Sequence, residues 1–448
     1  MDRFVVQARS ESIKDAPAAF AEPGRPWRPM FRVACGNFLE MYDFQIFGYY
    51  ATAIARNFFP SGNEFASLML ALATFGAGFL VRPLGAVVLG PYIDHHGRRG
   101  GLLLTLGLMA VGTVSIACTP SYASIGLIAP LLVVMGRLVQ GLSAGVEVGG
   151  VAVYLFEVAP PRHRGFWVSW QTASQAMAVM LAAVLGLALT ARLTGDQITR
   201  WGWRVPLLVG CAIIPLLFRL RRSLQETPEF LRVKQHLLPR ENLRALVQHW
   251  RLLVLGVLLT MMSTVSFYMI TAYTPTFGAK VLRLGAKANM TVILSVGVFI
   301  FLWLPVMGAI SDRLGRRPLL TAMSLLTLVS CYPAFSWLVA APSIGRLMTV
   351  DLWLSFLFAG YNGALIIFLT EIMPPGVRTA AFSVVHSSTA AVFGGFTPAI
   401  STYLIHATGN PAIPGLWLSF AALCGLIATG CLAATPAQNN EQIRVEFV

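Results

Sequence analysis

From about residue 31 to residue 434, long apolar stretches alternate with short polar or charged breaks. Most of the stretches reach the roughly 20 residues that an α-helix needs to cross the hydrocarbon of a bilayer. Barrel strands would be about 10 residues long with alternating polarity. The pattern therefore predicts an all-α membrane protein. We place twelve transmembrane helices at 31–56, 65–90, 101–118, 124–157, 166–190, 204–219, 252–274, 288–310, 318–340, 346–372, 380–405 and 411–434.

Three polar segments divide the chain. Residues 1–30 contain no long apolar run, so we expect a cytoplasmic tail and not a signal peptide. A second tail covers 435–448, and a central cytoplasmic loop covers 220–251. This organisation predicts two six-helix bundles, at 31–219 and 252–434.

Charge supports a membrane location with both termini inside. Apolar residues make up 56% of the chain and charged residues 12%, against roughly 25% charged in soluble domains. Of the 33 Lys and Arg residues, 23 fall in segments assigned to one side and eight in those assigned to the other. By the positive-inside rule the richer side is cytoplasmic, which we take to be the inside of a bacterial inner membrane.

The excess of 33 basic over 19 acidic residues does not predict nucleic-acid binding, because the basic residues lie in short clusters between apolar runs. The six cysteines lie inside apolar stretches without a C-x-x-C pair, so we expect free thiols and no metal site.

Two motifs occur once in each half, as Gly90-Pro-Tyr-Ile-Asp94-His-His-Gly97-Arg98-Arg99 and Gly308-Ala-Ile-Ser-Asp312-Arg-Leu-Gly315-Arg316-Arg317, and as Glu157-Val-Ala-Pro160-Pro-Arg-His-Arg164 and Glu371-Ile-Met-Pro374-Pro-Gly-Val-Arg378. The offsets of 218 and 214 residues indicate a duplicated unit. Glycines allow a tight turn, and an aspartate can accept hydrogen bonds from a helix N-terminus. We predict that these residues act as cytoplasmic gates: Gly90, Asp94, Gly97, Arg98, Glu157, Arg164, Asp312, Gly315, Arg316, Glu371 and Arg378.

On these motifs the chain resembles the major facilitator superfamily over essentially its whole length. The segments that carry a closer resemblance are Gly36-Asn-Phe-Leu-Glu40-Met-Tyr-Asp43-Phe, Arg82-Pro-Leu-Gly and Arg137-Leu-Val-Gln-Gly for metabolite:proton symporters, and Glu64-Phe-Ala-Ser-Leu-Met, Arg222-Ser-Leu-Gln-Glu-Thr, Tyr273-Thr-Pro-Thr-Phe-Gly and Phe393-Gly-Gly-Phe-Thr-Pro for citrate and tricarballylate symporters. The resemblance implies two pseudo-symmetric bundles around a central cavity that work by alternating access. We expect the chain to function as a monomer. Asp94-His95-His96 departs from the family pattern, which has an arginine after the aspartate.

Charged residues inside predicted spans are functional candidates by default, because a charge at bilayer depth is costly. Asn37, Glu40 and Asp43 form one polar stripe on the first span. Repulsion between the two carboxylates in a low-dielectric setting favours proton uptake by one of them. A purely structural role for Glu40 is the alternative interpretation.

On the fourth span Arg137, Gln140 and Glu147 share a face, and a glycine ridge beside them indicates close helix packing. A buried guanidinium needs a carboxylate partner. Related sugar symporters use a first-helix aspartate with a fourth-helix arginine, so the resemblance implies an Asp43–Arg137 pair that couples proton release to transport.

Two intramembrane arginines, Arg82 and Arg137, favour an anionic small-molecule substrate, because guanidinium groups bind carboxylates with two hydrogen bonds. We predict that the substrate contacts these arginines together with Asn37, Gln140, Gln171, Gln175, Tyr268, Tyr273, Tyr361 and Asn362, although polar residues also hold helices together.

Enzyme signatures are missing: the sequence has no Walker loop and no H-E-x-x-H motif. We therefore expect a secondary transporter without a cofactor, with H+ (or Na+) as the co-transported ion. The resemblance alone implies that the substrate is a tricarboxylate, citrate or tricarballylate, and that it is imported. An exporter or exchanger of another organic anion remains the alternative, and a membrane receptor or enzyme is a less favoured class.

Overall fold

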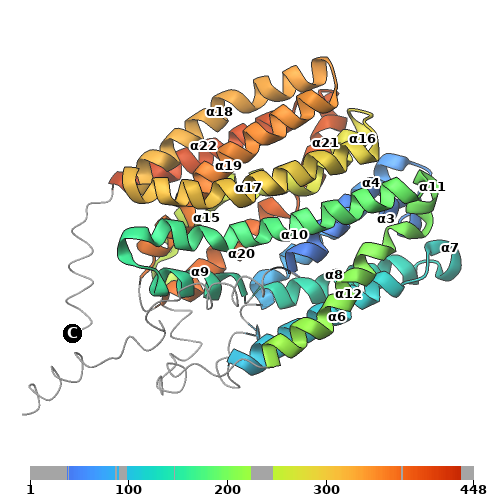
Figure 1. The fold of residues 1–448 in the computed structure, drawn as a ribbon, viewed down its shortest axis with the longest axis horizontal. Coiled ribbons are helices and arrows are strands. Elements are labelled where there is room, and N and C mark those ends of the chain that lie inside the picture. Colours follow the sequence, from blue (N-terminus) through green and yellow to red (C-terminus); the bar gives the residue numbers. More distant parts are fainter. Residues whose placement is uncertain are drawn as a thin grey trace, which may run out of the picture.

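The computed structural model describes residues 38, 40–85, 88–89, 98–145, 147–222, 246–374 and 377–434, and within these ranges it contains helices and no strand (Figure 1). The N-terminal half begins with the helical stretch 40–49 and continues with α3 (Ala51–Phe58), α4 (Glu64–Leu80), α6 (Arg98–Cys118), α7 (Tyr122–Ile125), α8 (Ile128–Ala144), α9 (Glu147–Val158), η1 (Pro161–His163), α10 (Arg164–Arg192), α11 (Gly195–Gln197), η2 (Ile198–Gly202) and α12 (Arg204–Arg222).

The C-terminal half contains α15 (Trp250–Tyr268), η3 (Met269–Tyr273), α16 (Thr274–Lys280), α17 (Ala286–Leu314), α18 (Arg316–Ala340), α19 (Ile344–Ile372), α20 (Arg378–Thr389), η5 (Ala390–Gly394), α21 (Thr397–Thr408) and α22 (Pro414–Ala434). In the described part of the chain, seven helices are long and apolar enough to cross a membrane, and shorter apolar helices cover Leu103–Cys118, Ile128–Ala144 and Arg204–Pro215.

The fourth predicted span is not one helix. Segment 124–157 contains α7, α8 and α9, and the chain bends between α7 and α8, where Gly126 has φ +59°. Gly145 after α8 keeps right-handed helical backbone angles, and residue 146 lies outside the described residues, so the face shared by Arg137 and Glu147 stays a prediction.

Two spans of the C-terminal half contain a π-helical segment followed by Thr-Pro. η3 precedes Thr274-Pro275 at the start of α16, and η5 lies shortly before Thr397-Pro398 at the start of α21. Proline has no N–H to donate and is well placed in the first turn of a helix, so each Thr-Pro favours a new helical start. The wide turns before them allow each span to change direction.

Helices of the two halves lie against each other along the length of the molecule. In Figure 1, α10 (green) runs beside α17 (yellow), and these two helices are in extensive contact. Contacts of α4 with η5 and α21, and of α9 with α20, join the halves elsewhere. The interface between the halves is therefore formed by α4, α9 and α10 on one side and α17, α20, η5 and α21 on the other.

Candidate functional site

A buried ion pair joins the first helical stretch to the end of the second span. Arg82 lies in the helical turn 82–85 after α4, and its Nη2 is 2.9 Å from Glu40 Oε1. The side chains are 1% and 3% exposed, respectively. Burying a charge costs free energy unless it is paired, so each residue offsets the free-energy cost of burying the other. Sequence analysis selected both residues but did not pair them.

Arg137 and Asp43 are linked through Gln140 and are not in direct contact. Arg137 donates from Nη1 to Gln140 Oε1 (3.0 Å) and from Nη2 to the carbonyl of Phe75 (3.3 Å). Gln140 Nε2 lies 3.1 Å from Thr113 Oγ1 and 3.5 Å from Asp43 Oδ2, and the Thr113 hydroxyl donates to the same Asp43 oxygen. The expected direct Asp43–Arg137 ion pair is therefore wrong for this conformation.

Aromatic rings surround both guanidinium groups. The Cζ atoms of Arg82 and Arg137 lie 4.6 Å and 4.2 Å from the centroid of the Phe44 ring, which they share. At these distances the ring faces attract the cations without offering them a carboxylate. Further rings lie within 4.3–5.3 Å of one or other Cζ atom: Phe79 for Arg82, and Phe47 and Phe75 for Arg137.

This cluster is balanced in formal charge and has hydrogen-bonding capacity to spare. It contains two arginines (Arg82, Arg137) and two carboxylates (Glu40, Asp43), all buried. Within the described part of the chain, Nε of each arginine and Oδ1 of Asp43 have no hydrogen-bond partner. A carboxylate ligand could use the free N–H groups, but it would leave the cluster with excess negative charge unless a proton came with it.

Four other residues that sequence analysis placed near the substrate are buried: Tyr268, Gln171, Gln175 and Tyr273. Tyr268 lies beside the arginine cluster, with its ring centroid 5.1 Å from that of Phe79. Gln171 and Gln175 lie one helical turn apart on the buried face of α10. Tyr273 accepts a hydrogen bond from Thr402 (3.2 Å).

Tyr361 and Asn362 are used within the C-terminal half. The Tyr361 hydroxyl donates to the carbonyl of Leu259 (2.7 Å), and Asn362 Nδ2 donates to Ser263 Oγ (2.6 Å), so both side chains tie α19 to α15. Asn362 Oδ1 has no hydrogen-bond partner among the described residues.

Asp312 connects the two halves at the end of the molecule where α10 begins and α17 ends. We call this end, which carries Arg164, Arg316 and Arg378, the arginine-rich end. The Asp312 carboxylate accepts hydrogen bonds from the backbone N–H groups of Gly165 (2.8 Å) and Phe166 (3.0 Å), at the start of α10. A carboxylate at a helix N-terminus is favoured by both the free N–H groups and the helix dipole. Arg316 holds the same carboxylate at 2.7 Å and lies 3.7 Å from Glu371.

The remaining loop residues surround this contact. Gly165 and Gly308 let α10 and α17 meet backbone to backbone, since a Cβ on either would lie within 2.5 Å of the other's carbonyl oxygen. Gly315 has φ +89°, which favours glycine. Arg164 and Arg378 lie 4.3 Å and 5.1 Å from the centroid of the Phe156 ring.

Four of the residues selected from the sequence lie outside the described part of the chain, and three more lie near its gaps or at the end of a helix. Asn37, Gly90, Asp94 and Gly97 lie outside the described residues. Arg98, Glu147 and Glu157 are helical; the Glu157 side chain is exposed near the end of α9.

Two buried polar residues of the interior were missed by sequence analysis. Thr113 on α6 bonds Asp43, and nothing in the uncharged sequence around it signals that contact. Asp351 is buried in α19 and accepts a hydrogen bond from Thr274 (3.0 Å). A charged residue inside an apolar span is a sufficient signal, and it should have selected Asp351 as it selected Glu40.

Comparison with known proteins identifies the family. A profile described as sugar (and other) transporter matches residues 30–243 and, separately, residues 239–447. The chain belongs to this family. It is a transporter and not an enzyme, and the predicted membership of the major facilitator superfamily is confirmed.

Relatives at much higher identity carry a more specific name. The chain is 54% identical over 403 residues to a protein of Salmonella typhi named citrate-proton symporter, covering 90% of this chain and 93% of the relative. A Klebsiella pneumoniae protein of the same name is 55% identical over 400 residues, covering 89% and 90%. An Escherichia coli protein named alpha-ketoglutarate permease is 32% identical and covers 87% of this chain and 89% of its own length.

Solved structures show the same fold. The E. coli xylose transporter in a partially occluded inward open conformation superposes with a TM-score of 0.72, at 18% identity, covering 91% of this chain and 97% of the transporter. A D-xylose-proton symporter gives 0.71 at 17% identity, with 90% and 95% covered. The prediction of a twelve-helix major facilitator fold is thereby confirmed.

Proposed function

We propose that the chain imports citrate together with protons by alternating access across a bacterial inner membrane, with both termini in the cytoplasm. Two facts support the substrate: relatives at 54% and 55% identity are named citrate-proton symporters, and two buried arginines offer unused N–H groups. Tricarballylate, a tricarboxylate without the citrate hydroxyl, is a second candidate. We further propose that the chain works as a monomer and that residues 31–219 and 252–434 are the two moving bundles.

The charge balance of the arginine cluster is the observation that carries the coupling. A carboxylate that enters it needs one of the two buried carboxylates to be neutralised, and a proton does so without a cofactor. Proton and anion then bind with mutual support, which is the requirement for symport. We assign the proton to Asp43, because one of its oxygens has no hydrogen-bond partner and Gln140 relays it to Arg137.

Uptake of labelled citrate into proteoliposomes with an imposed pH gradient or an imposed sodium gradient tests this proposal. We expect accumulation with the pH gradient only. Accumulation driven by sodium alone would contradict proton coupling, and efflux without uptake would favour the exporter.

The variant Asp43→Asn separates binding from coupling. It keeps the side chain's shape but cannot exchange a proton, so we expect citrate exchange between equal concentrations to persist and pH-driven accumulation to fail. The matched control Asp196→Asn changes an exposed aspartate on α11 and should accumulate citrate normally. Normal accumulation by Asp43→Asn would remove Asp43 from the coupling and leave Glu40 as the proton acceptor.

A further inference from the structure

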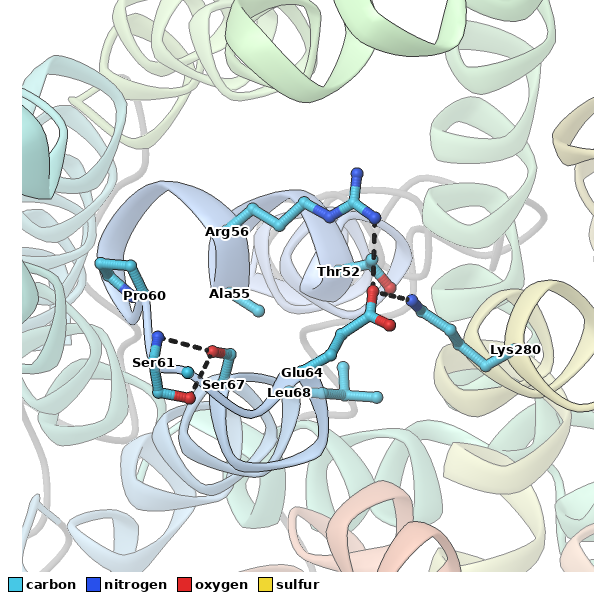
Figure 2. Close-up of a pocket in the computed structure, with 10 residues that line it drawn as sticks. Thr52, Ala55, Arg56, Pro60, Ser61, Glu64, Ser67, Leu68 and Lys280 are labelled. Atoms are coloured by element: carbon cyan, nitrogen blue, oxygen red, sulfur yellow. Dashed lines mark hydrogen bonds and ion pairs between the residues drawn. The ribbon is translucent and has the colours of Figure 1, made fainter.

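A cavity of about 330 Å³ opens where the loop between α3 and α4 faces α16 (Figure 2), at the end of the molecule away from the start of α10 (Figure 1). By the positive-inside count this end is the outer one. Polar side chains of both halves line the cavity: Thr52, Arg56, Ser61, Glu64, Ser67 and Lys280.

Within this cavity, one carboxylate is shared by two cations. Glu64 Oε1 lies 2.5 Å from Lys280 Nζ and 3.3 Å from Arg56 Nη2, as the dashed lines in Figure 2 show. Arg56 and Glu64 belong to the N-terminal half and Lys280 to the C-terminal half. The link therefore joins the halves at the outer end, beside the stacked rings of Phe65 and His406, whose centroids are 3.9 Å apart.

Unlike the central cluster, this group is accessible to solvent and is not balanced in charge. The side chains of Arg56, Glu64 and Lys280 are 56%, 64% and 29% exposed. Two positive charges share one negative charge, so one positive charge is left over at the rim of this cavity. An exposed ion pair is weak, and a dissolved anion can therefore compete for it.

The serine hydroxyls beside the cations are already hydrogen-bonded, and Ser61 Oγ donates to the carbonyl of Asn63 (2.6 Å). Ser61 and Ser67 hold each other through their Oγ atoms (3.0 Å), and the Ser61 N–H donates to Ser67 Oγ (3.1 Å). Figure 2 shows this pair on the same side of the cavity as Glu64. A ligand with several carboxylates can give Arg56 and Lys280 one carboxylate each, whereas Glu64 offers both cations the same oxygen.

We propose that Arg56 and Lys280 form an outer loading site for a polycarboxylate anion, in which Glu64 holds the place of one ligand carboxylate until the ligand displaces it. Displacement releases Lys280 from Glu64, and the ligand, held by Arg56 of one half and Lys280 of the other, then takes the place of the direct ion-pair link at this end. The identity of that ligand as citrate rests on the proposed function.

The two partners of the link should respond to substitution in opposite directions. In intact cells producing the full chain, Lys280→Gln removes a cation that the ligand needs, and we expect the KM for external citrate to rise about three- to tenfold, since a partly screened charge-assisted bond is lost. Glu64→Gln removes the competing carboxylate and should lower the KM. Lys287→Gln, which removes an exposed charge near the same end, is the matched control and should leave the KM unchanged.

A link that only holds the halves together predicts something different: Lys280→Gln and Glu64→Gln both break it and should shift the KM in the same direction. That result, or an unchanged KM in Lys280→Gln, would overturn the site. Absence of citrate uptake by the unaltered chain would instead contradict the proposed function.

A binding readout keeps the two failures apart. In purified Glu64→Gln protein, citrate should protect Lys280 from an amine-reactive reagent and leave Lys287 reactive, as measured by mass spectrometry. Equal modification of Lys280 with and without citrate would overturn the site whatever the transport result.

Discussion

At the scale of single residues, the central problem is how two guanidinium groups are kept in an apolar interior. Arg82 has a carboxylate at 2.9 Å, whereas Arg137 has an amide, a backbone carbonyl and three aromatic faces. Arg137 is thus held by neutral groups, and its nearest acid is reached only through Gln140. The arginine with the weaker charge compensation is the one with more to gain from an anionic ligand.

Substituting one member of the Glu40–Arg82 pair should destabilise the protein more than substituting both. Arg82→Gln leaves a buried carboxylate without its cation, and we expect a loss of about 3 kcal/mol or more in stability together with loss of uptake. The double variant Glu40→Gln with Arg82→Gln removes both charges and should recover much of the stability but not the uptake. Thermal unfolding of the purified proteins in detergent measures the first effect, and citrate uptake the second.

Recovery of uptake by the double variant would show that the pair is structural only. An Arg82→Gln protein as stable as the unaltered chain would show that Glu40 does not depend on Arg82.

The identities of these residues could be predicted from the sequence, but their partners could not. Charge inside an apolar span selects Glu40, Asp43, Arg82 and Arg137 without any knowledge of the fold. Which acid meets which arginine depends on how the spans are rotated and how far each is inserted. For that reason the predicted pair, Asp43 with Arg137, is not in direct contact, and Gln140 lies between the two side chains.

At the scale of helices, glycines decide how closely the spans approach. A Cβ on Gly141 of α8 would lie 1.7 Å from the carbonyl oxygen of Gly78 on α4, and one on Gly85 would lie 2.1 Å from that of Leu142. The close helix packing predicted for the glycine ridge of the fourth span is confirmed at Gly141 by this contact. The approach of α4 to α8 brings Phe75 and Arg137 together, so packing and site geometry have the same origin.

Gly141→Ala should therefore separate α4 from α8. Because the obstructing atom belongs to the backbone, relief requires a helix shift, and we expect a loss of about 1–3 kcal/mol or more with reduced uptake. Gly107→Ala on α6 is the matched control: nothing lies within 4 Å of its Cβ position, so it should be neutral or slightly stabilising. Thermal unfolding in detergent compares the two, and equal melting temperatures would contradict the packing argument.

Element positions followed from hydropathy where a span is one long helix, as for α17 and α19. They did not follow where the backbone turns inside a span. The bend of 124–157 at Gly126 and the π-helical segments η3 and η5 lie in apolar surroundings, so hydropathy shows no break there. Thr274-Pro275 and Thr397-Pro398 are the local signals that could have located the second kind.

At the scale of the whole molecule, contacts between the halves occur at both ends, but they differ in kind. The end beside the Glu64 cavity has an exposed, solvent-screened link through Glu64 and Lys280, together with packing of α4 against α21 and the stacked rings of Phe65 and His406. The arginine-rich end has the glycine contact of α10 with α17, where the Asp312 carboxylate binds the N-terminus of α10. Because a less exposed carboxylate at a helix N-terminus is held more firmly than an exposed ion pair, the charged contact at Asp312 should resist opening more than the one at Glu64.

Weakening the contact at Asp312 should lower that resistance. Asp312→Asn removes the negative charge that two backbone N–H groups and Arg316 share, with a cost of roughly 0.3–2 kcal/mol for a charge at a helix N-terminus. We expect more frequent opening at the arginine-rich end and slower citrate turnover. The KM should change little, because Asp312 lines neither the cavity beside Glu64 nor the arginine cluster. A cysteine introduced by Ser169→Cys, beside the Gly165–Gly308 contact, should then react faster with a membrane-permeant thiol reagent. The parent chain with its natural cysteines corrects for background, and Asp196→Asn serves as the charge control. A large rise in KM with unchanged turnover and unchanged labelling would show that Asp312 acts on substrate binding and not on the opening of this end.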